Sequence, residues 1–283
     1  MTVADIKNIF KSEISGLYTD SEADFLFSVF VEKILGLNQI QIRMNNDLEL
    51  SDENEKKFKN IISDLKTEKP YQYILGETEF YGMCFYVNEN VLIPRPETEE
   101  LLELAINKIQ SSKLNLDQLK ILDIGTGSGI IPLVLKKHFS NAKISSIDFS
   151  EKALEAAKRN AEFHQLEVVF IHADYLNFNL NENYDVIISN PPYIGMDEEI
   201  EIEYSVKDFE PKMALFSPTE DALIFYKKIA EDSKKYLNKN GLLFLEINQK
   251  LGKETLELYK NEFKEADLIK DLSGNDRFVI AVK

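Results

Sequence analysis

One short stretch of the sequence has residue types and a spacing that suit the binding of a nucleoside. A glycine-rich loop follows an apolar segment and precedes a helical one, and it contains Gly125, Thr126, Gly127, Ser128 and Gly129. Glycine permits a tight turn and lets a ligand touch the backbone. The spacing is GxGxG rather than the GxGxxG of dinucleotide-binding proteins, and no Walker lysine follows, so NAD, flavins and ATP are disfavoured. We expect these five residues to bind a nucleoside cofactor.

Polar residues also end the next two expected strands. Asp148 ends the second strand, where a carboxylate can accept hydrogen bonds from both hydroxyls of a ribose. Asp174 and Tyr175 follow the third strand and are expected beside a bound adenine ring. The alternative is that the glycines only form a strand–helix turn and that Asp148 is an ordinary loop residue. The nucleoside site is favoured because ligands of such sheets bind at the carboxyl ends of the strands, and three consecutive ends carry suitable residues.

A second stretch suits the chemistry of a poorly nucleophilic nitrogen. Asn190, Pro191, Pro192 and Tyr193 follow the fourth expected strand. The prolines fix the backbone and donate no N–H, so carbonyl oxygens there can face outward as acceptors, with the Asn190 side chain as a further acceptor. Such acceptors can hold the hydrogens of a planar, conjugated NH₂ group while its nitrogen faces a reactive methyl group, which lowers the barrier by orientation and electrostatics. No metal is needed. The alternative is a rigid Pro-Pro turn that closes a strand.

The surrounding sequence predicts the elements that position these residues. From Lys120 onward, short apolar strands alternate with helices, which is typical of an α/β fold with a mostly parallel sheet covered on both faces. Strands are expected at 121–124, 144–147, 168–171, 186–189, 242–247 and 277–282, with a weaker candidate near Leu268. Helices are expected at 151–164 and 222–237.

The N-terminal part has a different pattern. Apolar residues at helical spacing predict a small helical domain over residues 1–70. Aromatic and β-branched residues alternate from Thr78 to Ile93, which predicts a β-hairpin linker over residues 71–93 with its turn at Asn88-Glu89-Asn90. A helix from Glu97 to Ile109, opened by proline, begins the third part, residues 94–283.

Composition narrows the functional class. The chain has 283 residues and a formal net charge of −16, so we expect no direct binding to nucleic acid, which requires concentrated Lys and Arg. The single cysteine, Cys84, excludes an internal disulfide, and three scattered histidines argue against a metal site. Neither a signal peptide nor a membrane-spanning apolar run is visible. These features predict a cytoplasmic protein without a membrane partner.

Several longer motifs occur in order along nearly the whole chain: Pro70–Gly76, Phe80–Gly82, Leu92–Glu99, Asn190–Tyr193, Phe209–Leu215 and Gly274–Arg277. With this ordered set, the chain resembles the S-adenosylmethionine-dependent methyltransferases with a Rossmann-like sheet. More narrowly, it resembles the HemK/PrmC family of protein-(glutamine-N5) methyltransferases, which act on peptide-chain release factors.

The resemblance implies a fold, a reaction and a set of roles. A small helical N-terminal domain helps to recognise the release factor, and a β-hairpin joins it to the catalytic domain. The cofactor is S-adenosyl-L-methionine, the product is S-adenosyl-L-homocysteine, and the acceptor is the glutamine of the Gly-Gly-Gln motif in class-1 release factors. Gly125 through Gly129 surround the cofactor, Asp148 holds its ribose, and Asn190 also lies against it. Asn190 and the Pro192 carbonyl hold the glutamine amide, with Tyr193 packed against it.

Two other acceptors stay open, namely a glutamine in a ribosomal protein and an amine of nucleic acid, adenine N6 or guanine N2. The net charge and the segment Pro94–Glu99 argue against the second. A cofactor-binding module without catalysis would require a damaged motif, and none is seen. Three further features are ambiguous. Arg95 either lines the site or pairs with Glu97 or Glu99, Glu246 either lies near the site or makes a structural hydrogen bond, and the acidic run 197–203 is either a solvated face or a segment that orders on a basic partner.

Overall fold

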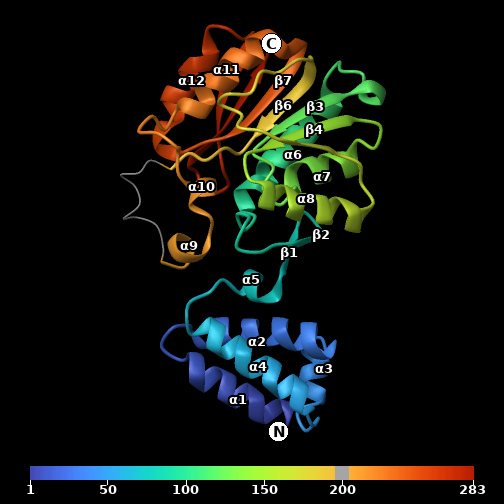
Figure 1. Cartoon of the computed structure of the whole chain (residues 1–283), viewed down its shortest axis with the longest axis vertical. Coiled ribbons are helices and arrows are strands. Elements are labelled where there is room, and N and C mark those ends of the chain that lie inside the picture. The colour runs from blue at the N-terminus through green and yellow to red at the C-terminus, as the bar shows by residue number, and fades with distance from the viewer. Residues whose placement is uncertain (195–203) are drawn as a thin grey trace. The chain divides into compact units, whose positions relative to one another are not determined.

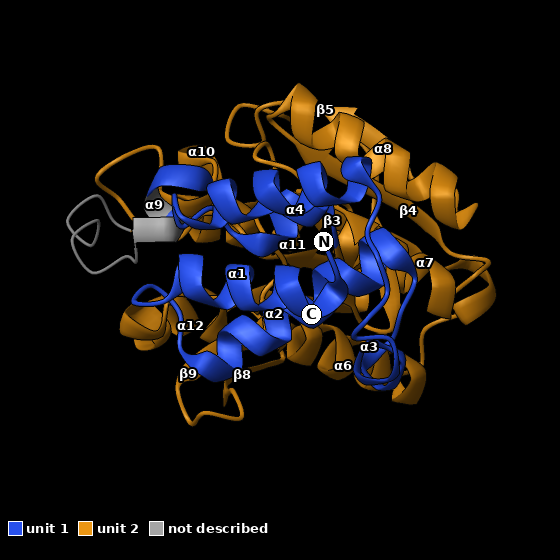
Figure 2. Ribbon diagram, turned by 90° about the horizontal axis from the view of Figure 1, so that it is seen from below, with its two compact units in different colours: residues 1–77, 203–209 blue, residues 78–202, 210–283 orange. Residues whose placement is uncertain are grey.

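The computed structural model describes residues 1–194 and 204–283, and the chain divides into two compact units (Figures 1 and 2). Of the described residues, 1–77 and 204–209 belong to unit 1, and 78–194 and 210–283 belong to unit 2. The acidic run at 197–203 lies outside the described residues. No helix within the described ranges is both long enough and apolar enough to cross a lipid bilayer.

Unit 1 is helical. Its helices are α1 (Val3–Ile14), α2 (Asp20–Leu35), α3 (Gln39–Met44), α4 (Asp52–Leu65), α5 (Tyr71–Leu75) and α9 (Tyr204–Phe209). Thr2 and Thr19 begin α1 and α2 with capping boxes, in which the threonine hydroxyl accepts a backbone N–H that the helix cannot satisfy itself. The apolar stripes of α1, α2 and α4 meet in one core around the buried rings of Phe10, Phe27 and Phe58.

A two-stranded hairpin follows unit 1 along the chain. It consists of β1 (Glu77–Phe80) and β2 (Met83–Tyr86). The predicted position of its turn, at Asn88–Asn90, is wrong: Tyr81 and Gly82 connect the strands, both with positive φ (51° and 65°). Asn88 instead forms a separate turn after β2, where its Oδ1 accepts a hydrogen bond from the Asn90 N–H at 3.0 Å.

A seven-stranded sheet forms the centre of unit 2, in the order β5-β4-β3-β6-β7-β9-β8. β3 through β7 are parallel, and β9 is antiparallel to both of its neighbours. The predicted mostly parallel α/β sheet is therefore confirmed. The strands are β3 (Lys120–Ile124), β4 (Lys143–Asp148), β5 (Val169–His172), β6 (Tyr184–Ser189), β7 (Leu237–Glu246), β8 (Glu265–Lys270) and β9 (Asp276–Val282).

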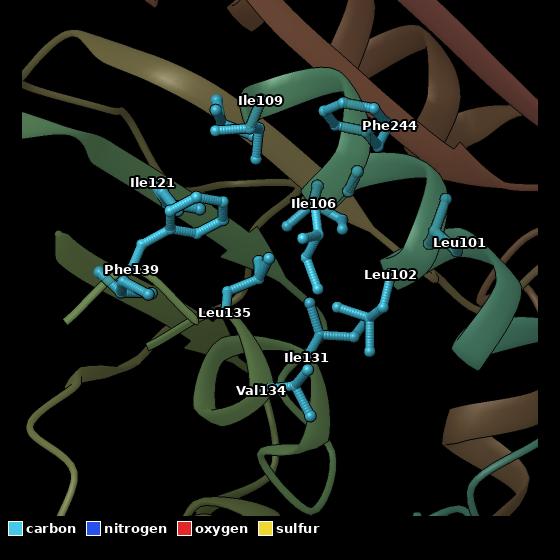
Figure 3. Close-up of a cluster of buried hydrophobic side chains, with 14 of the residues drawn as sticks. Leu101, Leu102, Ile106, Ile109, Ile121, Ile131, Val134, Leu135, Phe139 and Phe244 are labelled. Carbon is cyan, nitrogen blue, oxygen red and sulfur yellow. The ribbon is translucent and has the colours of Figure 1, made fainter. Parts of the chain in front are cut away.

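Helices cover both faces of this sheet because alternate strand residues point to opposite sides and most of them are apolar. Ile121 and Phe244 lie on the face covered by α6 and α7, whose side chains Ile106 and Leu135 belong to the same cluster (Figure 3). Leu122 and its neighbours on the other face pack with residues of α11 and α12. The helices and short 3-10 turns of unit 2 are α6 (Pro96–Ser111), η1 (Leu116–Gln118), α7 (Ile130–His138), α8 (Glu151–His164), α10 (Lys212–Leu215), α11 (Ile224–Tyr236), η3 (Gln249–Leu251) and α12 (Gly252–Lys260).

Candidate active site

Four parallel strands end side by side at one edge of the sheet. The register pairs Ile124 of β3 with Ile147 of β4 and with Ser189 of β6, and Ser189 with Leu245 of β7. The residues that come next along these four strands therefore line the same edge, and they are Gly125, Asp148, Asn190 and Glu246. This edge is where open α/β sheets bind their ligands.

The glycine-rich loop wraps around the end of β4. The backbone N–H groups of Gly125 and Thr126 both donate to the carbonyl of Ile147, at 2.9 and 3.2 Å. Gly129 ends the loop, and its N–H donates to the carbonyl of Thr126 at 2.9 Å. Ser128 is buried, and its carbonyl accepts a hydrogen bond from Asn160 Nδ2 of α8 at 2.8 Å. These bonds hold the loop against both the sheet and α8.

Asp148 is bound by the backbone on both oxygens. The N–H of Gly127 donates to Oδ2 and the N–H of Ser150 donates to Oδ1, each at 2.8 Å. Burial raises the pKa of the Asp148 carboxyl, and these two hydrogen bonds oppose that rise. The carboxylate is thus fixed in orientation, and each of its oxygens retains lone pairs for a further donor.

A buried polar cluster lies beneath the loop. The Ser146 hydroxyl donates to Asp123 Oδ2, and the hydroxyls of Thr126 and Ser146 are 2.5 Å apart. Asp123 is fully buried, and its Oδ1 has no hydrogen-bond partner among the described residues. Burial raises the pKa of this carboxyl to about 7.

Two glycines of the loop have different surroundings. At Gly129, where φ is +86°, a Cβ would lie 3.1 Å from the Cβ of Ala157 of α8, so this glycine permits close packing. At Gly127, where φ is +54°, a Cβ would meet no atom within 4 Å. The space beside Gly127 and Asp148 is therefore available to a ligand. S-adenosylmethionine fits these residues, because its ribose hydroxyls can donate to the two oxygens of Asp148, which the backbone holds in place.

The acceptor motif after β6 belongs to a hydrogen-bonded cluster. Asn190 Nδ2 donates to the Thr98 hydroxyl of α6 at 3.2 Å, and that hydroxyl donates to Glu246 Oε2 at 2.7 Å. The Tyr193 hydroxyl donates to Glu246 Oε1 at 3.4 Å. Within the described part of the chain, Asn190 Oδ1 and the Pro192 carbonyl oxygen accept no hydrogen bond. Both oxygens are thus free to accept hydrogens from a ligand.

Comparison with known proteins identifies the family to which the chain belongs. Residues 17–76 match the PrmC N-terminal domain, and residues 103–205 match the methyltransferase small domain. A release factor glutamine methyltransferase from Flavobacterium psychrophilum is 43% identical over 99% of this chain and 98% of that protein. The chain belongs to the release factor glutamine methyltransferase family. A second member, from Bacteroides thetaiotaomicron, is 38% identical over 96% of each chain.

Family membership confirms the resemblance drawn from the ordered motifs, and with it the prediction that the chain is a methyltransferase. The solved structures agree at the level of the fold. A methyltransferase from Pyrococcus furiosus aligns with 82% of this chain and 99% of its own length, with a TM-score of 0.51 and 18% sequence identity. Among the described residues of this methyltransferase, no three His, Cys, Asp or Glu side chains gather in a way that could hold a metal ion.

The two residues predicted to lie beside adenine, Tyr175 and Asp174, both make hydrogen bonds within the protein. Tyr175 of this methyltransferase is only 4% exposed, packs in the core of unit 2, and donates its hydroxyl to Asp232 Oδ2 at 2.8 Å. Asp174 is hydrogen-bonded to Leu176 N and Asn177 Nδ2 in the loop after β5. Tyr175 thus has little surface to offer a ligand. Its role as an adenine contact stays a prediction.

Sequence reasoning missed Phe149 as a candidate. It follows Asp148 directly, and its ring is 60% exposed although the chain buries most of its phenylalanines. The backbone carbonyl of Phe149 is hydrogen-bonded to His172 Nε2 at 2.9 Å, which fixes the turn that presents the ring. The signal was its position, one residue after the carboxylate expected to bind a ribose.

The structure shows the partners of Arg95 and Glu246, whose roles the sequence left ambiguous. Of the two alternatives for Arg95, pairing with Glu97 or Glu99 does not occur: its Nη2 lies 2.6 Å from Oε1 of the buried Glu210, whose Oε2 also accepts the Ile93 N–H at 3.2 Å. Glu246 is buried at the edge of the sheet beside Asn190, and burial raises the pKa of its carboxyl to about 7, opposed by the hydrogen bond from Thr98. It makes a hydrogen bond and also lies at the candidate site.

Proposed function

We propose that this enzyme transfers the methyl group of S-adenosyl-L-methionine to the N5 amide nitrogen of the glutamine in the Gly-Gly-Gln motif of class-1 release factors. S-adenosyl-L-homocysteine is the second product. The names of its relatives support this choice of protein substrate. The observation that carries it is the pair of unused acceptors, Asn190 Oδ1 and the Pro192 carbonyl, beside the glycine-rich loop at the end of β6. Two acceptors match the two hydrogens of a primary amide.

The cofactor-binding half consists of the loop from Gly125 to Gly129 together with Asp148. Asp148 accepts hydrogen bonds from the ribose hydroxyls while the backbone N–H groups of Gly127 and Ser150 keep its carboxylate in place. The exposed ring of Phe149 packs against the adenine. When bound, the cofactor supplies an electrophilic methyl group on a sulfonium ion.

The acceptor half orients the amide. The nitrogen lone pair of an amide is delocalised into its carbonyl, so the nitrogen is a weak nucleophile. Asn190 Oδ1 and the Pro192 carbonyl bind its two hydrogens and aim the nitrogen at the methyl group, and Tyr193 packs against the amide plane. Fixed acceptors of this kind stabilise the positive charge that develops on the nitrogen as the N–CH₃ bond forms and the S–CH₃ bond breaks. The alkylated nitrogen then releases one of its two protons to solvent, which leaves the neutral N-methyl amide.

Recognition of the release factor is assigned to the helical part. We propose that residues 1–70 bind the release factor, that residues 71–93 connect them to the catalytic domain, and that residues 94–283 carry out the transfer. The match of residues 17–76 to the PrmC N-terminal domain supports a dedicated N-terminal module. The net charge of −16 favours a protein surface over nucleic acid as the partner.

Methyl transfer from labelled S-adenosylmethionine tests the proposal. The substrates are a purified class-1 release factor from the same organism and its variant with alanine in place of the Gly-Gly-Gln glutamine. Label on the wild-type factor and none on the variant would support the proposed acceptor. Label on both would move the site elsewhere on the factor. No label on either, with the cofactor bound, would overturn the proposed substrate, and ribosomal proteins and RNA would then be tried as acceptors.

A further inference from the structure

The Asn190 side chain is one end of a chain of hydrogen bonds that crosses three elements. Its Nδ2 reaches Thr98 Oγ1 in the first turn of α6, at 3.2 Å, and Thr98 Oγ1 reaches Glu246 Oε2 at the end of β7, at 2.7 Å. Thr98 is 2% exposed and Glu246 is 1% exposed, so water does not replace either partner. Pro96 and Glu97 begin the helix, which fixes Thr98 in this place.

The chemistry of these groups determines which of them donates each hydrogen bond. An ionised carboxylate only accepts hydrogen bonds, and a hydroxyl has a single hydrogen to donate. Because Thr98 donates its hydrogen to Glu246, it can only accept from Asn190. The Asn190 amide must therefore present its NH₂ group to Thr98, which leaves Oδ1 for a ligand. This assignment follows from counting hydrogens and does not depend on which amide atom was placed nearer to Thr98.

Several groups around Glu246 oppose the effect of burial on its carboxyl. Its Oε1 accepts the hydroxyl of Tyr193 at 3.4 Å. Burial raises the pKa of the Glu246 carboxyl to about 7, the hydrogen bond from Thr98 and the positive charge of Arg277 on β9 oppose this rise, and the carboxyl is therefore ionised above about pH 7. The Tyr226 hydroxyl of α11 donates to the backbone carbonyl of Glu246 at 3.1 Å and so fixes the backbone beneath it.

We propose that Thr98 is a positioning residue for methyl transfer: by donating to Glu246 and accepting from Asn190, it fixes the Asn190 amide with Oδ1 turned toward the substrate amide. This inference rests on the proposed function, in which Oδ1 binds a hydrogen of the glutamine amide. If the Asn190 amide turned over, its NH₂ group would face the NH₂ group of the substrate, and two donors would oppose each other. Thr98 thereby selects between an attractive and a repulsive contact without touching the substrate.

The test compares Thr98→Val, which has the same shape without a hydroxyl, with Thr98→Ser, which keeps the hydroxyl. We expect kcat for methylation of the release factor to fall at least tenfold in Thr98→Val and to stay within threefold of wild type in Thr98→Ser. The dissociation constant for S-adenosylmethionine should change by less than twofold in both, because the Thr98 hydroxyl is hydrogen-bonded to Asn190 and Glu246 and to no residue of the glycine-rich loop. Circular dichroism confirms folding, and Thr98→Ala replaces Thr98→Val if the latter does not fold.

Three kinetic outcomes would overturn the inference. The first is a folded Thr98→Val enzyme with wild-type kcat. The second is an equal loss of kcat and of cofactor affinity, and the third is an equal loss of kcat in Thr98→Val and Thr98→Ser. Either of the last two would mean that Thr98 only supports the local structure. A wild-type enzyme that labels no release factor would instead contradict the proposed function, and the variants would then be compared by a method without substrate.

Nuclear magnetic resonance of the side-chain amides provides that method. The Asn190 NH₂ signals of the ¹⁵N-labelled enzyme are assigned by their loss in Asn190→Asp. In the wild type and in Thr98→Ser, we expect two well-separated proton signals, one of them protected from exchange by the bond to Thr98. In Thr98→Val the protection should disappear. Unchanged signals in Thr98→Val would overturn the positioning role, whichever substrate the enzyme methylates.

Discussion

The two halves of the proposed site are built in different ways. The cofactor half is one continuous loop, Gly125 to Gly129, closed by backbone hydrogen bonds onto the end of the neighbouring strand. The acceptor half joins side chains that are far apart in sequence, since Thr98 and Glu246 are separated by 148 positions. The first half depends on backbone shape, and the second depends on the direction of hydrogen bonds. We therefore expect mutations in the first to change cofactor affinity and mutations in the second to change turnover.

The largest expected effect on turnover comes from the acceptor half. Asn190→Ala removes an acceptor oriented toward the amide nitrogen, and loss of one such group lowers kcat by about 10²–10³-fold. The affinity for S-adenosylmethionine should change by no more than about threefold, or about 0.7 kcal/mol, because the Oδ1 acceptor removed in this variant is assigned to the substrate amide. Labelled methyl transfer and isothermal titration calorimetry measure the two quantities.

A matched control for this variant is Asn181→Ala, at an exposed asparagine before β6. It should leave both turnover and cofactor affinity unchanged. If Asn190→Ala lost turnover and cofactor affinity in equal proportion, the distinction between the two halves of the site would be wrong.

Asp148→Ala should have the opposite signature. The variant removes a carboxylate expected to bind two ribose hydroxyls, and hydrogen bonds to charged groups contribute about 1.5–3 kcal/mol each. We expect the cofactor to bind about 10²–10⁴-fold more weakly, with kcat at saturating cofactor changed only a few-fold. Calorimetry and initial-rate measurements over a range of cofactor concentrations distinguish the two, and an unchanged dissociation constant would remove Asp148 from the cofactor site.

The pH dependence of turnover tests the direction of the hydrogen-bond chain. The pKa of the Glu246 carboxyl is raised to about 7, so below this pH it is protonated, can donate to Thr98, and no longer fixes Asn190. We expect kcat at saturating cofactor to fall as the pH drops below this pKa and to level off near the value of Thr98→Val, in which Asn190 is also no longer fixed. Glu246→Gln is neutral at every pH, so it should lack this acid limb and have a kcat at pH 8 that is already lowered to the same level.

The free energy of unfolding should change with pH in the direction opposite to kcat. The folded-state pKa of Glu246 lies above its ordinary value of 4.5, so its contribution to folding is complete below pH 4.5 and is lost as pH rises through about 7. Asp123 has the same sign, since burial also raises the pKa of its carboxyl to about 7. Urea denaturation over a range of pH measures this dependence, and Glu246→Gln should remove only the contribution of Glu246. If the acid limb of the kcat profile persisted in Glu246→Gln, that limb would belong to another ionisable group.

The smallest effects come from two glycines of one loop. Gly129→Ala places a Cβ 3.1 Å from that of Ala157 and should lower the free energy of unfolding by about 1–3 kcal/mol through overpacking. Gly127→Ala meets no protein atom within 4 Å and should cost about 1 kcal/mol of backbone strain while weakening the cofactor more. Urea denaturation and calorimetry compare them. The reverse ranking would mean that the space beside Gly127 is not the cofactor site.

The same contrast explains how much the sequence could predict. The loop residues, the strand before them and the carboxylate of Asp148 follow from local patterns, because glycine spacing and strand periodicity are properties of adjacent residues. The partners of Asn190 could not be predicted, because the Thr98–Glu246 bond exists only once α6 lies across the end of β7. The hairpin turn was misplaced for a related reason: Asn88 and Asn90 are typical turn residues, whereas Tyr81 adopts a positive φ that local preference disfavours.

The place of β9 in the sheet bears on how the protein is made. β9 lies between β7 and β8 and pairs with both, yet it follows both in the sequence. During translation, these two strands therefore emerge from the ribosome before the strand that separates them, and each presents an open edge that can pair with other chains. The charge of Arg277 also lowers the pKa of the Glu246 carboxyl only when β9 is in place. A nascent chain that stops short of β9 is thus prone to aggregate and lacks this positive charge near the acceptor half of the proposed site.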